Sequence, residues 1–438
     1  MEVSNRVTRE RRGDVHGLRR SGLFFSLLAT IGIGLFSTSS ANPDSAQELS
    51  AVAKELRQIV EFNGDVFSGP GYQTLIQEGQ NAHFFLVGEE HGIAENPLLI
   101  AQLFSDLSDY GYGRLAIEVS PPMASALDQA AAKGGLQGLI DLYEQPGGEP
   151  AFFGMQQEAE LLVSVRKSVP DDQPAFWGCD YEVAGDRTLL RRLDEIGPPE
   201  TARGALNELV RVSETSWRQW EETGNPGFVF SFSADPQLVE NLRENWPNRN
   251  AEVAQILDTL EQTLLINQRW VAGDGYGSNV LRGHWLRQNF LNHWQSLPAT
   301  PDRPRVMAKF GASHVVRGLN MTNTWDIGSL VPELAQIEGL KSVSILVLPR
   351  PEAQIARLDP TRWTYVPAPA KGGYSDGLDP LIGAAYDDHF TLIPLKPLRA
   401  EVTGGSHAGS DDLIKSVTGF DYLLVMSGST PSSELVHE

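Results

Sequence analysis

The feature that most constrains the fold of this 438-residue chain is an alternation of short apolar runs with helical patterns. The first run, His83–Val87, leads directly into Gly88-Glu89-Glu90-His91-Gly92, and similar runs end at Glu118, Asp180 and His314. Runs that are apolar at nearly every position predict strands buried on both faces. Strands that alternate with helices predict an α/β fold, with a mainly parallel sheet and helices on both of its faces.

Helical spacing is clearest after the first run, where Leu99, Leu103 and Leu107 share one face of a helix predicted over 98–110. The other predicted helices cover 45–60, 121–133, 154–169 and 277–294, and the other strands cover 114–117, 175–178, 304–310, 342–348 and 422–426. Ligands bind beyond the carboxyl ends of the strands in such sheets. We therefore expect the polar residues that end four of the strands to form one site.

Two segments depart from the alternation. Residues 186–270 have an almost wholly helical pattern that is too long for one crossover, so we predict a helical insertion over about 186–275. Within it, the alternating Phe228–Phe232 predicts a short strand or a flap. Its aromatic residues either line a substrate site or pack the insertion against the sheet, and packing is favoured: Trp217, Trp220, Phe228, Phe230, Phe232, Trp246 and Trp270. Residues 364–410 are rich in Pro and Gly and predict irregular structure.

The first 41 residues have the layout of a secretory signal peptide. A basic stretch with six arginines precedes the apolar Leu23–Phe36, and the small residues Ser39-Ser40-Ala41 follow it. The apolar stretch is shorter than the roughly 18 residues that a membrane-spanning helix needs, so a retained anchor is the less favoured alternative. We expect cleavage near Ala41, a periplasmic or secreted location with no stable membrane anchor, and a single domain over 42–438.

Charge and cysteine content narrow the classes of function. Asp and Glu number 56 against 35 Lys and Arg, a net charge of −21 that argues against nucleic acid and anionic membranes as partners. We expect a small-molecule substrate, while the oligomeric state stays open. The only cysteine, Cys179, forms no intramolecular disulfide, and the adjacent Asp180 disfavours its thiolate form.

His91 is the predicted general base, because imidazole titrates near neutral pH and a carboxylate beside it can raise its basicity. We interpret Glu90 as that carboxylate and Glu89 as a helix cap or first-turn charge. Glu118 and His314, at the ends of two other strands, are the further catalytic candidates.

Asp180 and Lys309 are predicted binding residues. Asp180 ends a strand, where it either caps the next helix or faces the site. Lys309 lies within an apolar strand, where an unpaired ammonium costs several kcal/mol. We therefore expect Lys309 to pair with Glu118 or Asp180, or to point along the strand toward the site.

These motifs resemble those of the erythromycin esterase-like superfamily, which also contains the ChaN haem-binding proteins and the Tiki/TraB-type proteins. The resemblance spans roughly 84–348 and rests on five elements in order: Gly88–Gly92, Ala116-Ile117-Glu118, Gly178-Cys179-Asp180, Arg282 with Asn289, and Gly311–His314. It implies metal-independent hydrolysis in which His91 deprotonates water, while Glu118 and His314 orient it and stabilise the oxyanion or leaving group. Arg282 and Asn289 join the binding residues on the same grounds.

Three hypotheses follow. The leading one is an exported hydrolase that acts without a cofactor on an ester, lactone or related carbonyl substrate. Macrolides are not implied, since no Arg or Lys lies between His91 and Arg114, where the esterases carry an Arg. The second is a Tiki-like hydrolase or peptidase that holds Mn²⁺ or Zn²⁺ with Glu90, His91, Glu118, Asp180 and His314. The third is a ChaN-like protein that binds haem or iron without catalysis.

Overall fold

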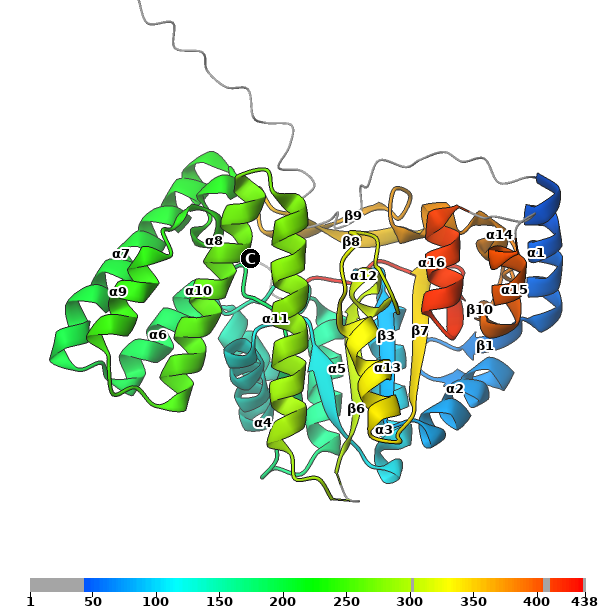
Figure 1. Ribbon diagram of the computed structural model, residues 1–438, viewed down its shortest axis with the longest axis horizontal. Helices are drawn as coiled ribbons and strands as arrows, with labels where there is room; N and C mark the ends of the chain where they lie inside the picture. Colours follow the sequence, from blue (N-terminus) through cyan, green and yellow to red (C-terminus); the bar gives the residue numbers. More distant parts are fainter. Residues whose placement is uncertain (1–42, 301–302, 405–409, 436–438) are drawn as a thin grey trace, which may run out of the picture.

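A computed structural model describes residues 43–300, 303–404 and 410–435 (Figure 1). The predicted signal peptide and its cleavage site near Ala41 lie outside these residues. Among the helices that the structure describes, none has the length and apolar content to cross a membrane.

Nine strands form one mixed sheet in the order β2-β1-β10-β11-β7-β3-β6-β4-β5. Six of them, from β11 to β5, run parallel, and β1, β2 and β10 add an antiparallel edge. Their bounds are β1 (Gln58–Phe62), β2 (Phe67–Ser68), β3 (Phe84–Glu89), β4 (Tyr112–Ile117), β5 (Phe176–Gly178), β6 (Arg305–Gly311), β7 (Ser342–Pro349), β10 (Phe390–Pro394) and β11 (Tyr422–Met426). The predicted α/β fold with a mainly parallel sheet is confirmed.

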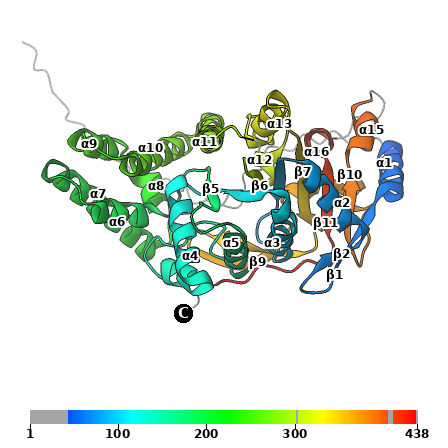
Figure 2. The same ribbon diagram turned by 90° about the horizontal axis from the view of Figure 1, so that it is seen from below.

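Helices cover both faces of the sheet, as the apolar strands require (Figure 2). In β3, Phe85 and Val87 belong to the core on one face, and Phe84 and Leu86 belong to the core on the other. The first core includes residues of α2 (Gly69–Asn81), α3 (Glu95–Leu107), α4 (Pro121–Tyr143) and α5 (Gln156–Ser168). The second includes residues of α1 (Pro43–Leu56), α11 (Gly275–Ser296), α12 (Ala312–Val315), α13 (Ile327–Ile337), α14 (Asp379–Ile382), α15 (Arg399–Thr403) and α16 (Asp411–Gly419).

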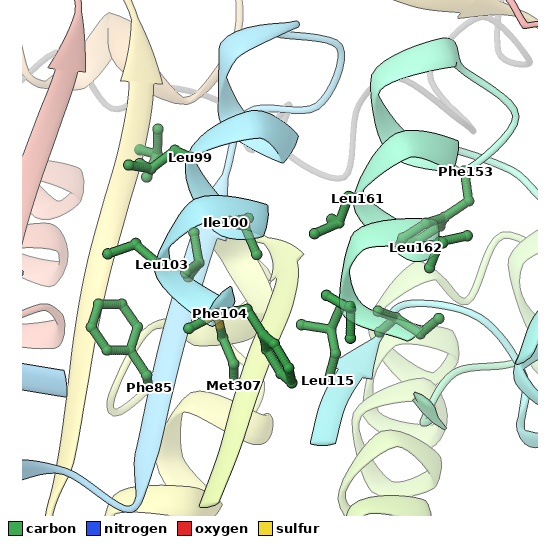
Figure 3. Packing of buried hydrophobic residues seen from close by; sticks show 14 of the residues in the cluster. Phe85, Leu99, Ile100, Leu103, Phe104, Leu115, Phe153, Leu161, Leu162 and Met307 are labelled. Carbon is green, nitrogen blue, oxygen red and sulfur yellow. The ribbon is translucent and has the colours of Figure 1, made fainter. Parts of the chain in front are cut away.

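Figure 3 shows how the first core fixes α3 and α5 over the strands. Leu103 and Phe104 of α3 lie toward Phe85 and Met307 of the sheet, and Leu161 of α5 lies across from α3. These residues are fully buried. Burial of each such side chain contributes about 1.5–3 kcal/mol, so the helices are held firmly against the sheet that carries the site.

The helical insertion is confirmed and has a core of its own, set at one end of the sheet (Figure 1). It consists of α6 (Asp186–Ile196), α7 (Glu200–Thr223), α8 (Phe230–Ser233), α9 (Gln237–Asn245) and α10 (Ala251–Val271). The short strand predicted at Phe228–Phe232 is wrong, because Pro226–Phe228 and Phe230–Ser233 are helical. Phe230 enters the core of the insertion and Phe232 enters a different cluster, whereas a strand would put residues two apart on one face.

The prediction that 364–410 is irregular is also wrong. The segment contains β10, and it supplies β9 (Thr364–Pro369), which forms a separate hairpin with β8 (Gln354–Asp359). Strand β10 lies between β1 and β11 and pairs with both, so its backbone hydrogen bonds are made with segments far away in the sequence. The helix predicted over 45–60 ends earlier, at Leu56, because the chain then enters β1, which pairs with β10.

Candidate active site

Most of the predicted site residues gather at the carboxyl ends of β3, β4 and β6. In the parallel register, Glu89 of β3 lies beside Gly311 of β6, and Lys309 of β6 lies beside Ile117 of β4. His91 follows β3 by two residues, and Glu118 is the first residue after β4. The sheet thus brings together side chains that are more than 200 residues apart in the sequence.

Glu89 is the carboxylate that holds His91. The His91 Nδ1 atom lies 2.8 Å from the Glu89 Oε1 atom. Residues two apart on an extended chain point to the same side, so Glu89 and His91 share a side that Glu90 does not. The interpretation of Glu89 as a helix cap is wrong, because Glu89 lies within β3 and α3 begins only at Glu95.

Glu90 points to a different part of the molecule. Its Oε2 atom accepts a hydrogen bond of 2.9 Å from the backbone N–H of Tyr374. The expectation that Glu90 orients the His91 imidazole is therefore wrong. Burial raises the pKa of the Glu90 carboxyl above its usual range, although the Tyr374 hydrogen bond opposes this.

Glu118 is the centre of the site. Its Oε2 atom accepts a 2.6 Å hydrogen bond from the Gly311 N–H and lies 3.6 Å from the Nε2 atom of His91. Its Oε1 atom accepts a 2.8 Å hydrogen bond from Arg282 and lies 3.4 Å from the Nε2 atom of His314. Both histidines therefore present their Nε2 edges to one carboxylate.

His314 has a carboxylate partner that the sequence does not reveal. Its Nδ1 atom lies 2.7 Å from the Oδ2 atom of Asp326, which also caps α13 through Ile327. An Asp before an apolar helical run signals a cap, but that signal cannot show which histidine the other oxygen contacts. The site thus contains two histidine–carboxylate pairs, His91–Glu89 and His314–Asp326, on two sides of Glu118.

Arg282 and Asp180 support Glu118 from the α11 side. The Arg282 guanidinium donates to both Asp180 oxygens, with Nε to Oδ1 at 3.0 Å and Nη2 to Oδ2 at 2.5 Å. The Asn289 side chain donates to the carbonyl of Cys179, 2.9 Å away, and so fixes the end of β5 rather than a catalytic group. Burial, together with the Asp180 charge, raises the pKa of the Cys179 thiol well above its usual range.

Lys309 pairs with Glu89 and Glu158, not with Glu118 or Asp180 as predicted. Its Nζ atom lies 2.5 Å from Glu89 Oε1 and 2.9 Å from Glu158 Oε1. The neighbouring Ala308 and Phe310 face the α11 core, so Lys309 faces the opposite side, where α5 carries Glu158. Burial raises the pKa of the Glu158 carboxyl to about 7, against the Lys309 charge.

The two histidines differ in their electrostatic surroundings. Burial lowers the pKa of His314, but the Asp326 and Glu118 charges outweigh it and raise that pKa to about 10. Burial also lowers the pKa of His91, while the Glu89 hydrogen bond and the Glu118 charge raise it above the usual value overall. The His314 imidazole is therefore a cation at neutral pH, and the charges of His314, His91 and Arg282 hold the pKa of Glu118 well below its usual range.

The side chains at the site also differ in their exposure to solvent. The His91 side chain is 21% exposed, whereas the side chains of Glu118 and His314 are 3% and 6% exposed. Of the two imidazoles facing Glu118, His91 is the one that water can reach.

No metal-ligand cluster is found among the described residues: no group of three or more His, Cys, Asp or Glu side chains is arranged to hold an ion. The Arg282 guanidinium donates to one oxygen of Glu118 and to both oxygens of Asp180, and Glu90 lies apart. The alternatives with Mn²⁺, Zn²⁺ or haem stay untested predictions without geometric support.

Solved structures share this architecture. A protein from Bacillus cereus is 15% identical, with a TM-score of 0.56, over 90% of this chain and 99% of its own. A mutant of the erythromycin esterase EreC, in its open conformation, is 14% identical, with a TM-score of 0.59, over 87% of this chain and 100% of its own. The chain has the erythromycin esterase-like fold.

A succinoglycan biosynthesis protein with this fold is 12% identical, with a TM-score of 0.57, over 90% of this chain and 100% of its own. The haem-binding ChaN of Campylobacter jejuni reaches a TM-score of only 0.30. No protein-family model and no curated protein matches the chain. The erythromycin esterase-like fold is therefore shown by structure, at identities too low to transfer an activity.

The aromatic residues of the insertion mostly pack, as favoured from the sequence. Phe230 and Trp246 lie in the core of the insertion, and Trp217 and Phe232 lie in a cluster with residues of the β8–β9 hairpin. An aromatic ring from outside the insertion, Phe152, comes from the loop before α5 and stacks on His91. No periodic pattern singles it out in the sequence.

Proposed function

We propose that this protein is an exported hydrolase that cleaves an ester, lactone or related carbonyl substrate by attack of water. The observation that carries the proposal is the pair of histidine–carboxylate couples facing Glu118, of which only His91 is open to water. An imidazole beside solvent suits a general base once it has lost its proton, and a buried imidazolium suits stabilisation of negative charge.

In the proposed reaction, the Nε2 atom of His91 takes a proton from water while Glu89 accepts the hydrogen bond of the Nδ1–H group. Glu118, near the same Nε2 edge, orients that water. The water oxygen bonds to the carbonyl carbon, and the bond to the alkoxy oxygen then breaks. His91 returns its proton to the leaving alkoxide, so the products are an acid and an alcohol.

His314 and Arg282 are the proposed stabilisers of the tetrahedral intermediate. Both are buried cations whose charges meet at Glu118. A preorganised positive charge in a site shielded from water stabilises a developing oxyanion without reorganisation. The erythromycin esterase among the structural neighbours shows that the fold can carry a hydrolase. It does not supply the substrate, and we propose a small carbonyl compound rather than a macrolide.

The test is hydrolysis of p-nitrophenyl acetate, p-nitrophenyl butyrate and δ-valerolactone by the purified protein. We expect activity in the wild type and its loss in His91→Ala and in His314→Ala. His389→Ala is the matched control, since that histidine is 44% exposed and pairs weakly with Asp388. Equal rates in all four proteins on every compound would rule out the proposed function.

Export is a separate part of the proposal and rests on the N-terminal sequence. Expression of the full chain in a bacterium, followed by fractionation and N-terminal sequencing, tests it. We expect the protein in the periplasm or medium, with Asn42 as its first residue. A cytoplasmic protein that keeps residues 1–41 would contradict export and leave the proposed chemistry standing.

A further inference from the structure

Phe152 covers one face of the His91 imidazole. The two rings are stacked, with centroids 4.2 Å apart and planes inclined by 12°. Glu89 holds the Nδ1 edge of the imidazole, and the Nε2 edge faces Glu118. Because Phe152 covers one face of the imidazole, water and substrate can approach only the other face and the Nε2 edge.

The backbone at Phe152 has an unfavourable conformation. Its φ is +65°, in the left-handed region, where the described residues include only two other non-glycine residues. Such a conformation is disfavoured for a residue with a Cβ atom, so it persists only where the surroundings impose it. An imposed conformation that places a ring on the proposed base points to a functional constraint.

Two tyrosine hydroxyls hold this loop in place. The Phe152 N–H donates a 2.7 Å hydrogen bond to the Tyr365 Oη atom, and the Tyr143 hydroxyl donates to the Phe153 carbonyl at 2.9 Å. Tyr365 belongs to β9 and Tyr143 to the last turn of α4, and both are buried. The loop is thus fixed by two elements from outside the parallel sheet.

The next residue, Phe153, extends the same arrangement. It is fully buried, and the Lys309 Nζ atom lies 4.9 Å from its ring centroid. His91 and Lys309 both contact the Oε1 atom of Glu89. Consecutive phenylalanines therefore cover both of them.

We propose that Phe152 is a positioning residue for His91: its ring, held by the Tyr365 hydroxyl, fixes the tilt of the imidazole and directs water and substrate to the Nε2 edge. The inference rests on the proposed hydrolase for its catalytic meaning. The Glu89 hydrogen bond alone fixes one atom of the imidazole and leaves the ring free to tilt. The stacked ring removes that freedom.

Two variants separate the ring from its support. Phe152→Gly removes the ring and suits the left-handed backbone, so the loop keeps its conformation. Tyr365→Phe keeps the ring and removes the hydroxyl that accepts the Phe152 N–H. Phe62→Leu is the matched control, because Phe62 of β1 is also part of a stacked pair, with Phe67 at 4.3 Å, and three strands separate β1 from β3.

The first readout needs no substrate. Diethyl pyrocarbonate labels neutral, accessible imidazoles, and peptide mass spectrometry reports the labelling rate at His91 and His314 separately. We expect faster labelling of His91 in Phe152→Gly, a smaller increase in Tyr365→Phe, and no change in Phe62→Leu. His314 is the internal reference and should not change. Unchanged labelling of His91 in Phe152→Gly would overturn the proposal.

The second readout is hydrolysis of p-nitrophenyl acetate. We expect kcat to fall about 10- to 100-fold in Phe152→Gly, with KM nearly unchanged, because a misplaced base slows the chemical step. A purely structural role would instead lower the melting temperature and leave kcat per folded molecule unaltered, which would overturn the proposal. If wild-type protein hydrolyses nothing, the proposed function fails, and the labelling of His91 still decides whether Phe152 positions it.

Discussion

The two histidine–carboxylate pairs at the sheet end have the same local geometry and different surroundings. His91 shares Glu89 with Lys309 and is 21% exposed, whereas His314 has Asp326 beside it and is 6% exposed. The Lys309 charge offsets part of the effect of Glu89 on His91. A histidine with a shared carboxylate and access to water can exchange its proton with solvent. The buried one remains a cation.

The largest effect should follow from removing the exposed histidine. His91→Ala takes away the general base, which typically contributes roughly 10²–10⁴-fold in rate. We expect kcat on p-nitrophenyl acetate to fall by about that factor, with folding intact by circular dichroism. A loss below about threefold would show that His91 does not serve as the base.

Asp326→Asn should lower the pKa of the buried His314 and so make its titration more like that of the exposed His91. Loss of the Asp326 charge lowers the His314 pKa from about 10, so the cation is lost as pH rises through a lower value. The falling, alkaline limb of the kcat profile should move to lower pH, with a loss of about 10²-fold above it. Asp274→Asn, which likewise removes the charge of a capping aspartate, at the start of α11, should leave the profile unchanged.

Glu89→Gln should have a smaller effect on the exposed pair. His91 must be neutral to act, so activity rises with pH through its pKa, and the loss of Glu89 lowers that pKa. The rising limb should move to lower pH, while kcat falls about tenfold because the base is weaker. The charges left near His91 are those of Glu90, Glu118, Glu158 and Lys309.

The matched variant is Glu95→Gln, which alters another buried carboxylate of the same segment, one that accepts hydrogen bonds from Thr430. The rising limb of its kcat–pH profile should coincide with that of the wild type. A shift to higher pH in Glu89→Gln would contradict the account of the exposed pair.

The smallest effect should come from chelation. Arg282 donates to one oxygen of Glu118 and to both oxygens of Asp180, which the alternative metal site would need, so prolonged treatment with EDTA should leave the hydrolysis rate unchanged. Elemental analysis of protein purified without chelator should find no bound Mn²⁺ or Zn²⁺ in proportion to protein. Loss of activity with EDTA and its return with added metal would favour a metal-dependent site.

Much of the fold follows from local sequence, because the apolar runs and the leucine spacing of α3 reflect contacts within single elements. β1 and β10 could not be predicted in this way, since they are strands only through pairing with distant partners. The identity of the site could be read from residues at strand ends. The contacts within the site could not be predicted. Whether Glu89 or Glu90 contacts His91, and whether Glu158 contacts Lys309, depends on which face of its element each side chain lies on.

The central claim is that the two similar pairs give their histidines different pKa values. Titration of the ¹⁵N-histidine-labelled protein by NMR, with His91→Ala and His314→Ala for assignment, measures both pKa values and tautomers without a substrate. We expect His314 to stay protonated up to about pH 10 and His91 to lose its proton at a lower pH, with the Nδ1 proton kept toward Glu89. A His314 that is neutral at pH 7, or two histidines that titrate together, would contradict the account.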